Sequence, residues 1–178
     1  NVSHIVNELD RASIEAMYRG DWIARKIVRA PAQDSTREWR NWQAKNEHIE
    51  AIEEVETQFN TQGKTYTALW KERLYGGSAL ILGIKNTGPA DEELDLDRIK
   101  AGSLQFVHAV SRYDLTVTEG LITDLLSPWF GRPKMYERHV PGAMPVRIHP
   151  SRVVAFTGED YPDINMCTEG WGESVLQV

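Results

Sequence analysis

The hydrophobic pattern of this chain changes its period at Gly76-Gly77. Before this point, apolar side chains such as Ile49, Ile52 and Val55 recur every three or four residues, which is typical of amphipathic helices. After it, residues 78–84 form a continuous apolar run that is too short for a helix and is bounded by turn formers, as in a buried strand. The sequence therefore predicts helices first and strands afterwards.

The first helical segment covers residues 3–29, where apolar residues are spaced for one helical face and Gly20-Asp21 divides two helices. Pro31 is expected to end the second of them, because proline has no N–H to continue a helix. The sequence Ser-Thr-Arg-Glu at residues 35–38 matches a capping box. A short helix through residues 39–42 is therefore expected next.

Residues 46–75 are expected to form a helical hairpin, with Gly63 ending its first helix. The strand candidates that follow are separated by segments that contain proline and glycine. Because helices and strands are segregated and do not alternate, the sequence predicts an α+β fold with a mostly antiparallel sheet. The strand candidates are residues 78–84, 104–110, 115–118, 134–140, 146–149 and 152–156.

We expect residues 1–178 to form one region, with a helical part at 1–75 and a β-rich part at 76–178. The last residues, from Gly170 onward, resemble the opening of a helix, and the chain begins at Asn1 without an initiator methionine. Both features indicate a piece of a longer protein.

Composition limits the function classes. Lys and Arg total 20 against 26 Asp and Glu, a net charge of -6, so the basic excess of a general nucleic-acid binder is absent. The single cysteine, Cys167, forms no intramolecular disulfide and supplies no cysteine-rich metal site. No membrane span or signal peptide is recognised, so the cytoplasm is the default location and no membrane partner is expected.

Charge is nevertheless unevenly distributed. Residues 46–62 contain five Glu and no Lys or Arg, whereas residues 128–157 contain five Lys or Arg and one Glu. Two interpretations stay open: two solvated surfaces, which is the commoner outcome, or complementary surfaces between neighbouring copies. The interface candidates are Glu50, Glu53 and Glu54 on one side, Arg132, Lys134 and Arg138 on the other, and Trp129 and Trp171 as packing residues.

Motifs that carry chemistry are sparse. The His-x-Ser pattern occurs once, at His149-Pro150-Ser151, whereas two-histidine phosphoesterases need two such motifs, so the pair is more simply a cap before the following strand. No Gly-x-Ser-x-Gly elbow, P-loop or paired metal-ligand spacing is present. The sequence predicts no catalytic residue, no metal site and no cofactor, and therefore a protein that is not an enzyme.

The order of several short segments resembles that of a portal-like family of tailed bacteriophages and prophages. The likeness extends over nearly the whole chain, and its specificity lies in the order of the segments. They are ARKIVRAPAQD (24–34), ERLYGGSALI (72–81), GRPKMY (131–136), IHPSRVVAFTG (148–158) and GWGESVLQ (170–177).

This resemblance implies the wing-like part of a portal subunit, before the stem helix. Such a subunit assembles with copies of itself into a ring, typically a dodecamer, at one capsid vertex of the virion. Double-stranded DNA is packaged and ejected through the ring without sequence-specific contacts. The resemblance also implies terminase, capsid and head-tail adaptor proteins as partners, with assembly in the host cytoplasm.

Some members of the family are labelled anti-CBASS, a name connected with a two-histidine cyclic-oligonucleotide phosphodiesterase. One alternative is therefore a hydrolase-associated phage protein whose catalytic part lies outside this chain. Another is a nucleic-acid-binding adaptor that uses the basic patch between Arg132 and Arg152.

Overall fold

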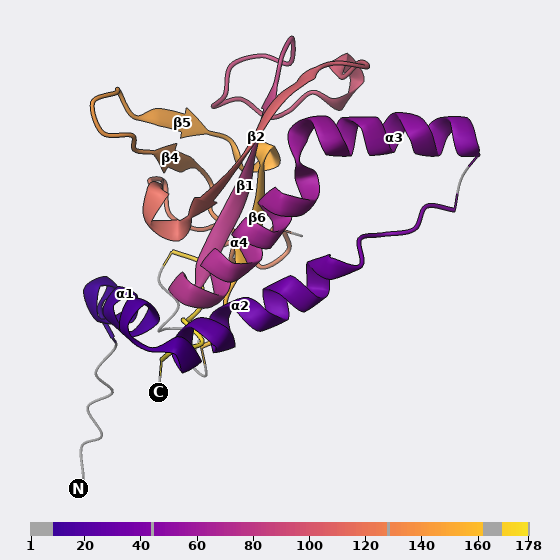
Figure 1. Ribbon diagram of the computed structural model, residues 1–178. Helices are drawn as coiled ribbons and strands as arrows, with labels where there is room; N and C mark the ends of the chain where they lie inside the picture. Colours follow the sequence, from indigo (N-terminus) through magenta and orange to yellow (C-terminus); the bar gives the residue numbers. More distant parts are fainter. Residues whose placement is uncertain (1–8, 44, 128, 162–168, 178) are drawn as a thin grey trace, which may run out of the picture.

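The computed structural model describes residues 9–43, 45–127, 129–161 and 169–177 (Figure 1). Helices occupy the first part and strands the second, which confirms the α+β prediction. No helix in these ranges is long and apolar enough to cross a membrane. The helices are α1 (Arg11–Gly20), α2 (Trp22–Arg37), α3 (Asn46–Phe59) and α4 (Thr61–Tyr75).

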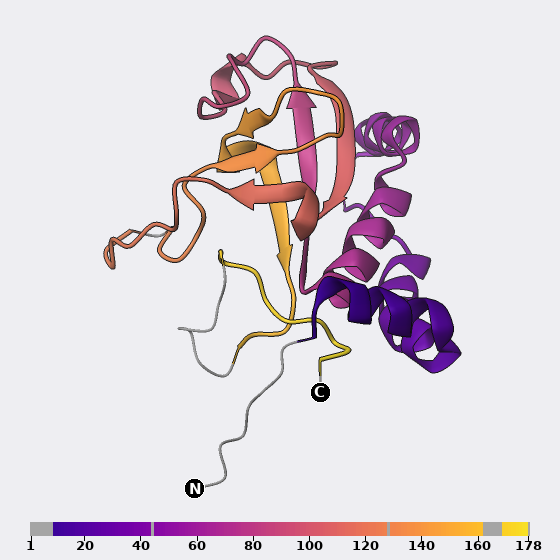
Figure 2. The same cartoon turned by 90° about the vertical axis from the view of Figure 1, so that its left-hand side faces the viewer.

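The strands form two antiparallel sheets of three strands each. The first has the order β2-β1-β6 and the second β3-β4-β5. Helices lie against one face of the first sheet and the second sheet lies over its other face (Figure 2). The strands are β1 (Gly77–Ile84), β2 (Leu104–Ser111), β3 (Leu115–Val117), β4 (Tyr136–Arg138), β5 (Val146–Ile148) and β6 (Val153–Thr157).

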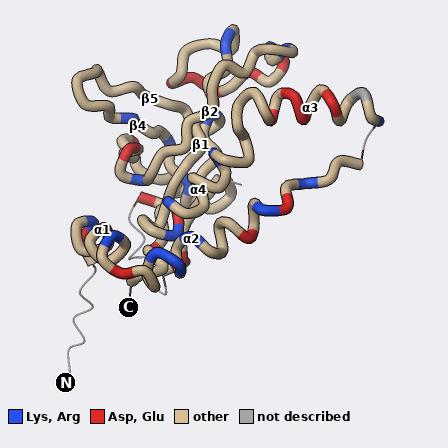
Figure 3. The backbone as a smooth tube through the Cα atoms, in the orientation of Figure 1, with Lys and Arg blue, Asp and Glu red and all other residues tan. Residues whose placement is uncertain are grey.

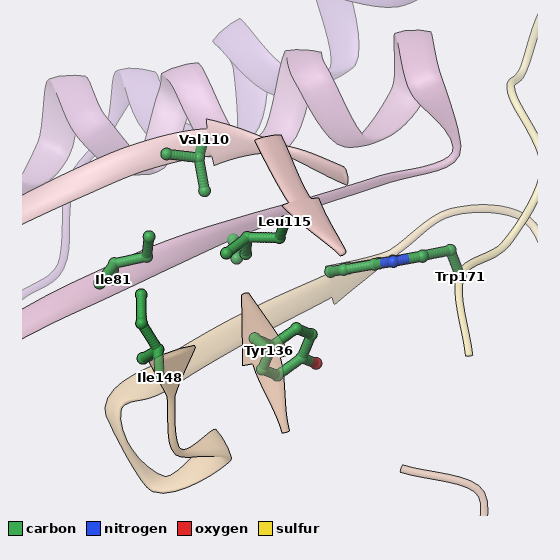
Figure 4. Packing of buried hydrophobic residues seen from close by; sticks show 7 residues of the cluster. Ile81, Val110, Leu115, Tyr136, Ile148 and Trp171 are labelled. Atoms are coloured by element: carbon green, nitrogen blue, oxygen red, sulfur yellow. The ribbon is translucent and has the colours of Figure 1, made fainter. Parts of the chain in front are cut away.

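The central strand β1 supplies side chains to both of its faces, because neighbouring residues of a strand point in opposite directions. Leu80 packs with Ala68 of α4, whereas Ile81 belongs to the cluster between the two sheets. That cluster contains Tyr136 and Trp171, whose ring centroids lie 6.0 Å apart (Figure 4). The continuous apolar run in the sequence thus reflects burial on both faces.

Helix α2 continues through Pro31, so the prediction that this proline ends the helix is wrong. Proline leaves the carbonyl of Ile27, four residues earlier, without its helical donor. Arg73 of α4 donates from Nη2 to that carbonyl at 3.1 Å. A long-range contact therefore replaces the hydrogen bond that the helix loses.

The capping box expected at residues 35–38 and the short helix expected at 39–42 are absent from the described chain. Ser35 instead lies inside α2 and donates from Oγ to the Pro31 carbonyl at 2.7 Å. The following segment is irregular and is tied to α3, since Trp39 Nε1 donates to a Glu56 carboxylate oxygen at 3.1 Å and Arg40 forms an ion pair with the same side chain.

Helices α3 and α4 confirm two helices over residues 46–75, but the break lies at Asn60 and not at Gly63. Asn60 has a φ of 49°, in the left-handed region that asparagine tolerates better than most residues. Its side chain accepts the Gly63 N–H at 3.3 Å and so caps α4. The two helices meet at a corner, from which α3 projects away from the sheets (Figure 1).

Three glycines from distant segments join backbone to backbone where α4 meets β1. The carbonyl of Gly76 accepts the N–H groups of Gly158 at 3.0 Å and Gly172 at 2.9 Å. Gly76 has a φ of 76°, and a Cβ there would lie 2.2 Å from the Gly172 oxygen. The described chain therefore ends in a β-bridge at Glu173 followed by a turn. The helix opening that the sequence led us to expect there is not formed.

Candidate functional site

A hairpin extension at residues 120–134 presents two of the predicted basic residues. Its backbone is fixed by hydrogen bonds from Ile122 N–H to the Arg132 carbonyl at 2.8 Å and from Lys134 N–H to the Gly120 carbonyl at 3.0 Å. Pro133 between them is buried. Arg132 and Lys134, on either side of Pro133, are exposed.

Arg132 and Lys134 line a hollow of about 510 Å³, here called the basic hollow. The guanidinium of Arg132 lies over the Trp129 ring, 4.8 Å from its centroid, and Trp129 is 55% exposed. Neither Arg132 nor Lys134 forms an ion pair with the described residues. The lining consists of Glu93, Ile122, Trp129, Arg132, Pro133, Lys134, His149, Pro150, Ser151 and Val153.

His149 caps the short 3-10 turn Pro150–Arg152 that precedes β6, and Ser151 lies inside this turn. His149 Nδ1 accepts the Ser151 N–H at 3.2 Å and lies 2.8 Å from Ser151 Oγ. Ser151 Oγ also accepts the N–H of Leu94 at 2.8 Å. The two side chains therefore fix this edge of the basic hollow.

The rest of the basic segment is divided among separate structural roles. Arg152 is only 3% exposed and donates to the side chain and carbonyl of Thr87 at 2.9 and 2.8 Å. Arg147 forms an ion pair with Glu119. Arg132 and Lys134 are thus the two cations of this basic segment that are exposed and form no ion pair with described residues.

Arg138 lies elsewhere, in an apolar groove beside Phe106, and its Nη1 is 3.0 Å from His108 Nδ1. Burial, followed by the charges of Arg138 and Lys64, lowers the pKa of His108. A neutral imidazole accepts the hydrogen bond that Arg138 donates. Arg138 is therefore separate from the basic hollow, although the sequence groups the three cations together.

The acidic candidates lie on the projecting helix. Glu50, Glu53 and Glu54 are exposed and form no ion pair with described residues. Figure 3 shows acidic positions along α3. We call these three side chains the acidic face of α3. It is an uncompensated negative surface that a basic partner surface could neutralise.

The two tryptophan candidates differ sharply in environment. Trp171 is 3% exposed and packs inside the cluster between the sheets (Figure 4), so its ring belongs to the interior of the chain. Trp129 stays on the surface beside the basic hollow. Sequence periodicity does not separate the two, because both lie outside regular helices and strands.

Sequence reasoning also missed two exposed apolar surfaces. One is the tip of the hairpin extension, where Leu125 is 80% exposed and Leu126 is 94% exposed. The other is the outer side of α2, where Trp22 is 71% exposed. The signal for the first was a run of large apolar residues next to a proline, outside any predicted strand.

The chemistry of this region is charge recognition. Two unpaired cations beside an exposed indole fit a carboxylate or another anionic group. Among the residues that the structure describes, no group of three or more His, Cys, Asp or Glu side chains is arranged to hold a metal ion. Cys167 lies outside the described residues.

A comparison with the profiles of known protein families shows to which family the chain belongs. The profile of the family described as "Phage portal protein" matches residues 12–178. The chain belongs to this family. The resemblance noted in the sequence is thereby confirmed at the level of the family.

Two curated relatives of this portal-family chain carry the name "Anti-CBASS protein Acb1". The one from Caulobacter sp. (strain RHG1) is 43% identical over 181 residues, which cover 100% of this chain and 29% of the relative. The one from Sphingomonas paeninsulae is 39% identical over 154 residues, which cover 86% and 24%. The chain therefore spans less than a third of the length of these relatives.

The names of these relatives correct one prediction. The sequence led us to expect a protein that is not an enzyme, but both relatives are named as anti-CBASS proteins. That is the label that the family resemblance connects with a cyclic-oligonucleotide phosphodiesterase. A single His-x-Ser motif was too local an observation to exclude an activity from a protein family whose members extend well beyond the matched residues.

Proposed function

We propose that this chain forms the body of a phage portal subunit, a structural part of the ring through which double-stranded DNA is packaged and ejected. Residues 1–178 would act together as its wing-like region, in a virion vertex contacted by terminase, capsid and head-tail adaptor proteins. The observation that carries the proposal is the portal-family match over residues 12–178.

The distribution of charge supports a ring built from unlike surfaces. A head-to-tail interface needs two different and complementary patches on each subunit. The acidic face of α3 and the basic hollow belong to opposite parts of the fold, since α3 extends the helical side and the hairpin extension projects from the β side (Figure 2). Glu53 of one copy would then approach Arg132 or Lys134 of the next.

The overall charge suits a DNA channel. A net charge of -6 and a basic cluster of only two unpaired cations favour weak contact with the phosphate backbone. DNA that must move through a ring benefits from contacts that do not hold it. The basic hollow is accordingly proposed for contact between subunits and not for DNA.

Charge reversal in the protein at its full natural length tests the interface. Glu53→Lys and Lys134→Glu should each weaken ring formation, and the double variant should restore it in part. An exposed ion pair contributes about 0.2 to 1 kcal/mol to the free energy of association. The loss at one interface is therefore modest, but every interface of the ring loses the same amount. Electron microscopy and sedimentation velocity give the fraction of protein in rings.

Asp91→Lys and Lys100→Glu are matched controls, because both residues are exposed and lie outside the two proposed surfaces. Rings that respond equally to the control reversals would show a general effect of net charge. A wild-type protein that forms no ring at any concentration would overturn the proposed function.

A second candidate function follows from the names of the relatives. We infer that the natural protein also carries an anti-CBASS activity, with its catalytic part outside the residues described here. Hydrolysis of cyclic oligonucleotides by the full-length protein, retained after residues 12–178 are deleted, would support this location. Activity that resides in the 178-residue chain alone would contradict it.

A further inference from the structure

Two apolar surfaces of the chain are exposed and lie on opposite sides of the fold. The first, here called the apolar tip, consists of Leu125, Leu126 and Phe130, which are 80%, 94% and 45% exposed. The second, here called the α2 stripe, consists of Trp22, Ile23 and Ile27, which are 71%, 50% and 45% exposed. Figure 2 shows the loop that carries the tip projecting away from the helices.

The apolar tip is presented on a fixed stalk. Gly131 N–H donates to the Ile122 carbonyl at 2.9 Å, close to the base of the tip. Within the loop, the Leu126 N–H donates to Asp124 Oδ1 at 3.0 Å. Because backbone hydrogen bonds fix the stalk, the tip loses less conformational freedom on docking than an unsupported loop would.

The α2 stripe borders a shallow hollow of about 550 Å³. Residues one turn apart on a helix share a face, so Ile23 and Ile27 lie one above the other and Trp22 lies beside them. The opposite face of α2 is occupied, since Ala24 and Val28 are buried against the rest of the chain. The stripe is therefore not needed for packing within the subunit.

We propose that the apolar tip of one copy docks on the α2 stripe of the next copy. The inference rests on the proposed ring, and it joins the β side of one subunit to the helical side of its neighbour. Two different patches on opposite sides are what a head-to-tail interface requires. Trp22 belongs to a residue type that often dominates the binding energy of interfaces, and the exposed leucine and isoleucine side chains add apolar area that docking would bury.

The charges around the two surfaces favour a second copy as the occupant. Residues 119–131 contain Glu119 and Asp124 and no Lys or Arg. The α2 hollow is lined by Lys26 and Arg73 and by no acidic residue. Glu119 is already paired with Arg147, which leaves Asp124 to meet the cations of the stripe.

An anionic membrane is a second occupant of the apolar tip that the charges nearby have to be weighed against. Binding to such a surface is strengthened by Lys and Arg near the inserted residues. Asp124 beside the exposed leucines would be repelled by such a surface, whereas Arg132 and Lys134 at the base of the same hairpin extension would be attracted to it. A lipid surface is therefore kept as an outcome that the experiment can detect.

Mixing two variants tests the head-to-tail contact. The tip variant combines Leu125→Ser with Leu126→Ser, and the stripe variant combines Ile23→Ser with Ile27→Ser, both in the full-length protein. Each alone should raise the concentration at which rings form by about tenfold or more. We then mix the two variants at a protein concentration above the ring-forming threshold of the wild type and below that of either variant. The intact tip of the stripe variant can dock on the intact stripe of the tip variant, so one-to-one dimers should form. The tip and stripe left free in such a dimer are both mutated, so no further copy can add.

The matched control combines Met144→Ser with Leu96→Ser, two residues that are 85% and 71% exposed and belong to neither surface. Mass photometry gives the size of the assemblies, and circular dichroism checks that every variant is folded. Asp124→Lys should weaken assembly, and its combination with Lys26→Asp should restore part of it.

The outcomes separate this inference from the proposed function. Wild-type protein that stays monomeric would overturn both. Rings that form equally well in the tip, stripe and control variants would overturn the docking and leave the ring intact. Flotation of the wild-type protein with phosphatidylserine vesicles, abolished in the tip variant while rings persist, would identify a membrane contact instead and would also overturn the docking.

Discussion

Helices α3 and α4 are adjacent in the chain and nearly equal in length, 14 and 15 residues, yet they have opposite roles. Helix α4 buries Ala68 and Leu74 against the sheet and the other helices. Helix α3 buries none of its described side chains and carries the acidic face. Helix α4 therefore contributes to the stability of the fold through its buried side chains, whereas α3 is available for contact with a partner.

The largest test of this difference replaces one apolar residue in each helix. Leu74→Ala, at a residue that is 1% exposed, should lower the free energy of unfolding by about 2 to 5 kcal/mol, because it leaves a cavity between α4 and α2. Val55→Ala in α3, at a residue that is 45% exposed, should change it by less than about 0.5 kcal/mol. Urea denaturation measures both, and equal losses would contradict the comparison.

The next test concerns the hydrogen bond from α4 to α2. Arg73→Met removes the donor to the Ile27 carbonyl, and because this hydrogen bond is exposed to solvent the change should cost about 0.5 to 1.5 kcal/mol. In a Pro31→Ala background the same change should cost less, because the alanine N–H at that position can donate to Ile27. A double-mutant cycle gives the coupling, and additive effects would show that Arg73 acts independently of the proline.

The corner between the helices is expected to give an effect of similar size. Asn60→Ala removes the cap on the Gly63 N–H and places alanine in a left-handed conformation, at an expected cost of about 1 kcal/mol. Asn60→Gly removes only the cap and should cost less, since glycine adopts a positive φ freely. Thermal unfolding compares the two variants, and a glycine variant that is the less stable of the pair would refute the role of the φ angle.

The smallest expected effect is a dependence of folding stability on pH, which arises from His108 in β2. Burial and the charges of Arg138 and Lys64 lower the pKa of His108 from its ordinary value of 6.5. Between the folded and unfolded pKa values the unfolded chain binds more protons, so stability is full above pH 6.5 and declines as the pH falls through it.

Denaturation midpoints at pH 7.5, 6.5 and 5.5 should therefore fall with pH, and His108→Gln should flatten part of this decline. His48→Gln is a control, because His48 is exposed and forms no ion pair with the described residues. A variant with His108→Gln that follows the wild-type profile would assign the dependence to other groups.

The candidate site illustrates how far sequence reasoning reaches. The alternation of exposed and buried side chains at Arg132, Pro133 and Lys134 is a local property, and the sequence correctly placed charge there. The segregation of Arg138, Arg147 and Arg152 was not predictable, because each contacts a residue at least 28 positions away. Charge counts along a segment do not state which cations are already paired.

The sequence alone determined the order of helices and strands and the point at which one gives way to the other. Hydrophobic period is set by backbone geometry, 3.6 residues per turn in a helix and two in a strand, so it can be read before the chain folds. The antiparallel prediction followed from the segregation of these elements. The relationship to portal proteins was likewise carried by the order of short segments.

Only the tertiary structure decided how the elements end and meet. Helix α2 passes through Pro31 because Arg73, distant in sequence, supplies a donor. The segment at Gly172 stays extended because its N–H binds the Gly76 carbonyl, where no side chain would fit. Buried backbone groups need partners, and packing chooses those partners across the whole chain, so no local pattern specifies them.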